Sequence, residues 1–144
     1  MDASARNRVR HGWAWVGLSL SLAIHVADEA THDFLSVYNP AVERIRQAAP
    51  WLPLPVFRFD VWLAGLIVAV IGLLCLSLLI FRGRSKLVWL SWLFGVFMCV
   101  NALGHFAGSL YMGKAMPGVY SSPLLLAAAV NLLWSARRLT TATK

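Results

Sequence analysis

Charged residues are scarce in this chain of 144 residues. Asp, Glu, Lys and Arg make up 13% of the sequence and apolar residue types make up 59%, whereas soluble domains average roughly 25% and 45–50%. Only six charged residues are acidic, against thirteen that are basic. A water-soluble fold needs more polar surface than this, so the composition excludes a cytosolic enzyme and a disordered tail.

Cysteine is also scarce, since Cys75 and Cys99 are the only two. If both lie on membrane-spanning helices, their depths differ by roughly 9 Å at the usual helical rise. This separation is too large for a disulfide unless the helices slide. We therefore expect both to be buried, apolar packing residues.

Long stretches without a formal charge dominate the chain. Three of them contain 21, 27 and 22 residues, and each exceeds the roughly 20 residues that cross the hydrocarbon core of a bilayer. A fourth stretch of 16 residues, 12–27, reaches spanning length if its helix continues to His32. The sequence therefore predicts an all-α fold with a single domain, 1–144, built as a four-helix transmembrane bundle with helices at about 12–32, 60–81, 87–113 and 118–136.

The first stretch also has features of a signal peptide, because Arg6, Arg8 and Arg10 precede it like a basic n-region. His25 and Asp28, however, occupy the place of the small-residue cleavage signature. We therefore interpret this stretch as a retained helix.

Lys and Arg are distributed unequally between the two sides of the predicted bundle. A cytoplasmic N-terminus puts nine of them inside and four outside, as the positive-inside rule requires. Both termini are therefore expected in the cytoplasm. Contact with anionic lipid explains the net charge of +7, and no nucleic-acid partner is expected. The nine inner residues are Arg6, Arg8, Arg10, Arg82, Arg84, Lys86, Arg137, Arg138 and Lys144.

The one long connection, 33–59, lies between the first two predicted helices. An amphipathic stretch from Pro40 to Ala49 leads into a segment with three further prolines and Trp51. Tryptophan and proline in this arrangement suit the membrane–water interface. We expect an interfacial helix and a covering loop on the outer face, which is either a plain linker or a functional lid.

Ionisable residues gather at the outer end of the first predicted helix. His25, Asp28, Glu29 and His32 fall within an arc of about 100° on that helix. Ionisable groups near hydrocarbon are costly and usually face a partner or a polar cavity. The third helix offers a complement at similar depth, Asn101 and His105. One site in the outer leaflet is therefore expected to draw on both helices.

Imidazole and carboxylate groups at helical spacing are typical ligands of zinc or iron. The predicted metal ligands are His25, Glu29, His32 and His105, with Asp28 and Asn101 supporting them and Asp28 and Glu29 as candidate catalytic groups. Because His25 and His32 are separated by about 10.5 Å of helical rise, the set fits one or two ions. The alternative is that these side chains are hydrogen-bonded packing residues or lie in the wet interface.

Two further features have simpler interpretations. His11 lies among the N-terminal basic residues and is expected at the membrane interface. Gly104 and Gly108 form a small-residue motif that predicts close helix packing, and the same face is available for an oligomer.

Several short motifs resemble the small bacterial integral membrane proteins named for their HXXEE motif. The segment His25-Val-Ala-Asp28-Glu29 matches with Asp in place of the first Glu. His105 is similar to the family's further histidine. Ala115-Met116-Pro117-Gly118 is similar to its Tyr-x-Pro-Gly element, with alanine in place of tyrosine. The resemblance implies a metal-binding protein of a bacterial inner membrane and names no substrate.

Two classes of function follow. The first is a metal-dependent membrane enzyme acting on a lipid-like substrate by hydrolysis, isomerisation or oxidation. Desaturases and hydroxylases of the histidine-box type need far more histidines than this site provides. The second is a non-catalytic protein that binds a metal, handles protons, or serves as an accessory or scaffold subunit. Membrane lipids are expected partners in both.

Overall fold

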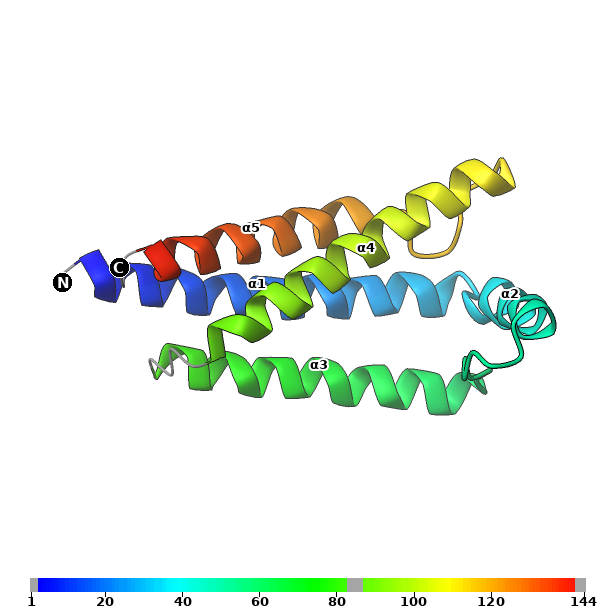
Figure 1. Cartoon of the computed structure of the whole chain (residues 1–144), viewed down its shortest axis with the longest axis horizontal. Helices are drawn as coiled ribbons and strands as arrows, with labels where there is room; N and C mark the ends of the chain where they lie inside the picture. The colour runs from blue at the N-terminus through cyan, green and yellow to red at the C-terminus, as the bar shows by residue number, and fades with distance from the viewer. Residues whose placement is uncertain (1–2, 83–86, 142–144) are drawn as a thin grey trace.

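The computed structural model describes residues 3–82 and 87–141, which form helices, turns and loops without strands. The expected all-α fold is confirmed. Arg84, Lys86 and Lys144, which were counted for the topology, lie outside the described residues. Five helices follow one another along the described chain (Figure 1): α1 (Ala3–Thr31), α2 (Leu35–Ala48), α3 (Phe59–Phe81), α4 (Val88–Met112) and α5 (Ser122–Thr141).

The first and last helices differ in length from the predicted ones. Helix α1 already begins at Ala3, because the arginines before Gly12 are good helix formers and nothing in this segment breaks the helix. Helix α5 begins at Ser122, later than expected, since Gly118 has a φ of +88° that is incompatible with a helix.

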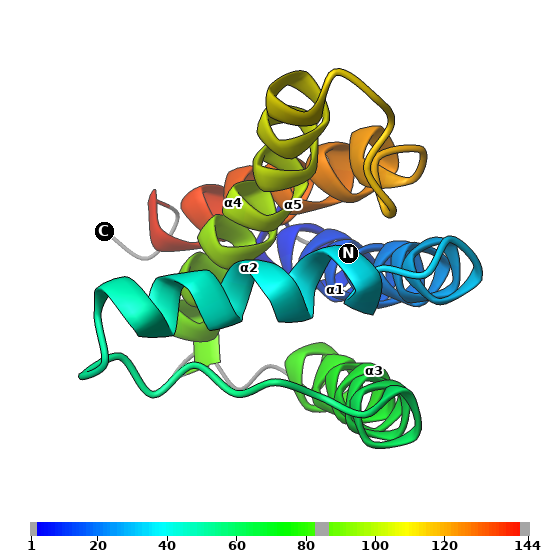
Figure 2. The same ribbon diagram turned by 90° about the vertical axis from the view of Figure 1, so that its right-hand side faces the viewer.

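The connection 33–59 contains helix α2, which begins before the predicted start at Pro40 and includes that proline. In Figure 1 this helix is seen end-on beside the ends of the long helices, and in Figure 2 it lies across them. Leu35 and Val42 are its buried residues. Helix α2 thus covers one end of the bundle, in the orientation expected of an interfacial helix.

Helix α1 is the central element of the bundle. It packs against α3 and α5, and α5 also packs against α4, which crosses the bundle obliquely (Figure 1). Trp15, Leu18, Leu125 and Leu132 form part of the fully buried core. Because α4 and α1 carry their polar residues into this core, groups far apart in the sequence meet inside it.

Two helices, α3 and α4, are long and apolar enough to cross a membrane by length and composition. All four long helices expose large apolar side chains, among them Leu20, Val68, Val100 and Val130. The transmembrane four-helix bundle remains a prediction that these faces support.

Some small and polar residues lie differently from expectation. Cys75 and Cys99 are free thiols, but Cys75 is exposed, so the prediction that both are buried is wrong. His11 is buried inside the bundle. A Cβ atom at Gly104 would meet open space, whereas one at Gly108 would meet Met116. Gly108 therefore packs within the chain, and only Gly104 offers a free surface.

Candidate metal centre

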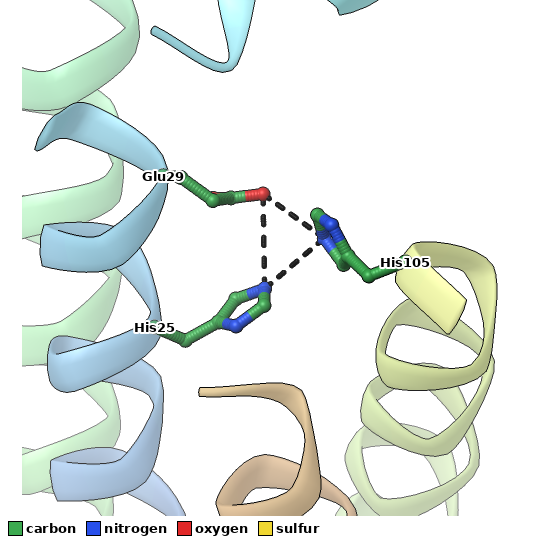
Figure 3. Close-up of side chains that lie close together, drawn as sticks. All are labelled: His25, Glu29 and His105. Atoms are coloured by element: carbon green, nitrogen blue, oxygen red, sulfur yellow. Dashed lines mark hydrogen bonds and ion pairs between the residues drawn. The ribbon is translucent and has the colours of Figure 1, made fainter. Parts of the chain in front are cut away.

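Three side chains from two helices converge inside the bundle. His25 and Glu29 extend from α1 and His105 from α4 (Figure 3). Nε2 of His25 lies 3.2 Å from Nε2 of His105, and Oε1 of Glu29 lies 3.7 Å and 3.2 Å from the two nitrogens. The i, i+4 spacing on α1 places its two ligands one above the other, so one residue of α4 completes the group.

These distances fit a metal ion. A tetrahedral zinc ion with bonds of about 2.0–2.1 Å separates its ligand atoms by about 3.4 Å. Candidate ligand atoms of the three residues all lie within 4.8 Å of one another, and all three side chains are buried. Two imidazoles and one carboxylate form a common catalytic ligand set that leaves a fourth position open.

Ser121, at the start of α5, fixes the orientation of His25. The serine hydroxyl donates to Oδ2 of Asp28 over 2.7 Å, and its backbone N–H donates to the same oxygen over 2.8 Å. The hydroxyl oxygen lies 2.9 Å from Nδ1 of His25. The hydrogen-bond network therefore assigns the proton of His25 to Nδ1, which leaves a lone pair on Nε2 facing the group.

The centre of the group has more hydrogen-bond acceptors than donors. Nε2 of His25 and Oε1 of Glu29 both act as acceptors, and one proton on Nε2 of His105 can satisfy only one of them at a time. Nδ1 of His105 is buried without a hydrogen-bond partner in the described part of the chain. Because unpaired buried acceptors and carboxylates are costly, a cation bound between the three atoms would satisfy them together.

Gly118 allows the turn before α5 to approach the group. A Cβ atom there would lie 2.6 Å from Cε1 and 2.8 Å from Nδ1 of His105, and 3.1 Å from Cγ of Glu29. Its positive φ also disfavours any other residue. Two separate reasons therefore favour glycine at position 118: its backbone conformation, and the lack of room for a Cβ atom beside His105 and Glu29.

Aromatic rings cover the side of the site that faces α2. Phe34, in the turn between α1 and α2, lies with its ring centroid 5.7 Å from that of His105 and 6.0 Å from that of Trp62. Tyr38 of α2 packs against the same phenylalanine at 5.5 Å. These rings separate the ligand group from the exposed end of the bundle.

The other predicted site residues lie around this group. Oδ2 of Asp28 accepts a hydrogen bond from Ser121, and Oδ1 of Asp28 lies 2.9 Å from Nδ1 of His32. The side chain of His32 is 51% exposed and is not part of the group of His25, Glu29 and His105. Asn101 lies one turn before His105 on α4, and its Oδ1 is buried without a partner among the residues described. Three of the four predicted ligands therefore meet, and His32 is not among them.

An apolar cavity of about 620 Å³ adjoins the ligands between α1, α3 and α4. His25, Glu29 and Asn101 line it, and the remaining lining residues are apolar or small, such as Leu66 and Phe97. Its volume is in the range of small-molecule sites. The site is therefore accessible to an apolar molecule that carries one polar group.

Sequence reasoning missed Ser121 and the close approach of Gly118. Both lie in the segment Pro117-Gly118 to Ser121-Ser122, which is typical of a turn followed by a helix start. Ser122 does act locally, since its hydroxyl donates to the carbonyl of Gly118 over 2.7 Å. The sequence around Ser122 does not distinguish it from Ser121, whose side chain forms hydrogen bonds with residues of α1 instead.

The fold and the site together define an all-helical protein with a buried group of two histidines and one glutamate that could hold a metal ion. The chain belongs to the HXXEE family, described as a protein of unknown function with HXXEE motif, which it matches over residues 15–132. Comparisons with curated proteins and with solved structures gave no match.

Proposed function

We propose that this protein is a metal-dependent integral membrane enzyme that acts on a lipid-like substrate. The convergence of His25, Glu29 and His105 carries this proposal, because three buried ligand atoms meet without enough protons to satisfy one another. Their separations support one ion, zinc or iron, in place of two.

Each residue of the site has a distinct role in this proposal. An ion held by the three residues would supply a Lewis acid. Glu29 would hold the ion through one carboxylate oxygen, and its other oxygen is the candidate proton acceptor. Asp28 is a positioning residue, since its carboxylate binds Ser121, which in turn accepts from Nδ1 of His25. Such outer partners fix the tautomer of a ligating histidine.

The proposed location is a bacterial inner membrane, with a multi-pass chain and both termini in the cytoplasm. The apolar exposed faces of the long helices support it, together with the uneven distribution of Lys and Arg. In this orientation the metal centre lies in the outer leaflet beneath α2, and an oligomer would use the face around Gly104.

The cavity beside the ligands supports a lipid-like substrate. Its α3 wall extends from Leu66 to Leu79, which is 14 residues, or about 20 Å of helical rise, and accommodates a long aliphatic chain. The polar group of that substrate would lie beside Glu29 and Asn101. The unpaired Oδ1 of Asn101 would accept a hydrogen bond from a hydroxyl or amide of the substrate.

Elemental analysis of the protein purified in detergent without added chelator tests the metal centre. We expect about one zinc or iron per chain, and loss of that metal in His105→Ala and Glu29→Ala. His32→Ala is the matched control and keeps the metal, because His32 lies outside the group. A parent protein with substoichiometric metal, or variants that keep it, would disprove the site.

Turnover is tested separately, by incubating the metal-loaded protein with an extract of total membrane lipids and identifying products by mass spectrometry. We expect one lipid class to be depleted by the parent protein and not by Glu29→Ala. A redox-inert zinc centre predicts hydrolysis or isomerisation, and an iron centre predicts oxidation. If metal binds and no lipid class changes, the protein is a non-catalytic metal-binding or proton-handling protein.

A further inference from the structure

A second cavity lies between the first part of α1 and the last part of α5, far from α2. It has a volume of about 250 Å³ and is formed by α1 and α5. Arg10 of α1 and Arg138 of α5 both line it, together with the side-chain amides of Asn7 and Asn131. Every one of these four side chains can donate hydrogen bonds.

The two arginines have no anionic partner in the described part of the chain. No carboxylate of the described residues lines the cavity, and neither Arg10 nor Arg138 forms an ion pair with any of them. Two guanidinium groups at one cavity repel each other unless an anion lies between them. The cavity is therefore complementary to a negatively charged group.

Tryptophan side chains shape this cavity for a ligand from the bilayer. The guanidinium of Arg138 lies 4.6 Å from the ring centre of Trp134, in a cation–π contact that orients it. Trp134 and Trp13 line the cavity and are 58% and 64% exposed. Indoles of this kind favour the membrane–water interface, at the depth of lipid headgroups.

We infer that the cavity between α1 and α5 is a binding site for a phosphate group, and that its ligand is the headgroup of an anionic phospholipid. Guanidinium groups bind phosphate oxygens through paired, charge-assisted hydrogen bonds. The amides of Asn7 and Asn131 would bind the headgroup's remaining oxygens. Because Arg10 is 15 residues from His25 on α1, about 22 Å, this site is independent of the metal centre.

Native mass spectrometry of the full chain in detergent tests the inference, with phosphatidylglycerol, phosphatidylcholine and inorganic phosphate as separate probes. The variant is Arg10→Ala/Arg138→Ala. The control Arg44→Ala/Arg137→Ala removes the same charge from two exposed arginines that do not line the cavity. Far-UV circular dichroism verifies that both variants fold.

We expect phosphatidylglycerol to bind the parent and the control equally, and the Arg10→Ala/Arg138→Ala variant at least about tenfold more weakly, as the loss of charge-assisted hydrogen bonds predicts. Phosphatidylcholine should bind more weakly than phosphatidylglycerol to the parent. If inorganic phosphate binding depends on the two arginines and phosphatidylglycerol binding does not, the cavity is a phosphate site for a soluble ligand, and the proposed lipid ligand is wrong. Equal weakening in the variant and the control, or none in either, would overturn the site.

Discussion

Two buried histidines of α1 occupy equivalent places in the bundle and have different surroundings. At the position closer to α2, Nδ1 of His25 bonds to Ser121, and Nε2 faces His105 and Glu29. The groups around Nε2 of His25 include more hydrogen-bond acceptors than donors. The position is therefore short of protons, and a cation would complete it.

At the other position, around His11, each of the hydrogen-bond donors has an acceptor. The indole N–H of Trp15 donates to Ser91 over 3.0 Å, and the hydroxyl of Ser91 donates to Nε2 of His11 over 3.0 Å. Nδ1 of His11 donates to Ser135 over 2.7 Å, and Ser135 donates to the carbonyl of Leu132. Both ring nitrogens of His11 therefore form hydrogen bonds, and neither has a free lone pair that could bind a metal.

The two positions share one helical framework. Corresponding residues are 14 positions apart, or about four turns and 21 Å, so they occupy the same faces of their helices. Burial of a histidine is thus common to both positions, and the neighbouring side chains decide its chemistry. The corresponding pairs are His11 and His25, Trp15 and Glu29, Ser91 and His105, and Ser135 and Ser121.

The largest expected difference separates His25→Ala from His11→Ala. We expect His25→Ala to lose the metal, since one of three ligands is removed. His11→Ala should keep it and lower the free energy of unfolding by about 2 kcal/mol, because buried hydrogen-bonding groups lose their partner. Elemental analysis and denaturant unfolding in detergent measure the two effects. Metal loss in His11→Ala would show that the two positions are coupled.

Ser121→Ala has the next largest expected effect. Removing the hydroxyl leaves Nδ1 of His25 without its acceptor, and loss of such an outer partner typically weakens metal binding about 10- to 100-fold. Ser135→Ala is the matched control, since Ser135 contacts His11. Competition with a metal chelator measures both affinities. Equal affinities in the two variants would contradict the role of Ser121.

Gly118→Ala should weaken metal binding by about tenfold and lower stability by about 2 kcal/mol, because an L-residue at positive φ is strained. Its Cβ atom would also displace His105 or Glu29. Gly17→Ala is the control, since a Cβ atom there meets nothing within 4 Å. Thermal unfolding and chelator competition report the two effects. A Gly118→Ala protein that behaves like Gly17→Ala would show that the turn can move aside.

The convergence of His25 and Glu29 on one face of α1 could be predicted because helical periodicity fixes which side chains share a face. His25 and Glu29 follow from spacing alone, and His105 follows from its depth in the predicted bundle. The all-α fold follows from the uncharged stretches in the same way. These features depend on one helix at a time, or on the position of a residue along its helix.

What could not be predicted depends on how helices cross. The same periodicity that found Glu29 also placed His32 on the site face, but α1 ends at Thr31, and His32 lies in the turn that follows. The contact of Ser121 with His25 and Asp28 depends on the packing of α5 against α1. The complete hydrogen bonding of His11 likewise requires serines from α4 and α5.

His32→Ala should have the smallest effect and defines the limit of the site. Its imidazole lies 2.9 Å from Oδ1 of Asp28 and is 51% exposed, whereas the side chain of Asp28 is 8% exposed. Because solvent screens the exposed partner, we expect the pair to contribute about 1 kcal/mol. Asp28 keeps both hydrogen bonds from Ser121 in the variant, so His25 keeps its orientation. Metal affinity should therefore change by less than about threefold, well below the effect of Ser121→Ala. A loss as large as that of Ser121→Ala, measured by the same chelator competition, would place His32 among the ligands and restore the two-ion arrangement.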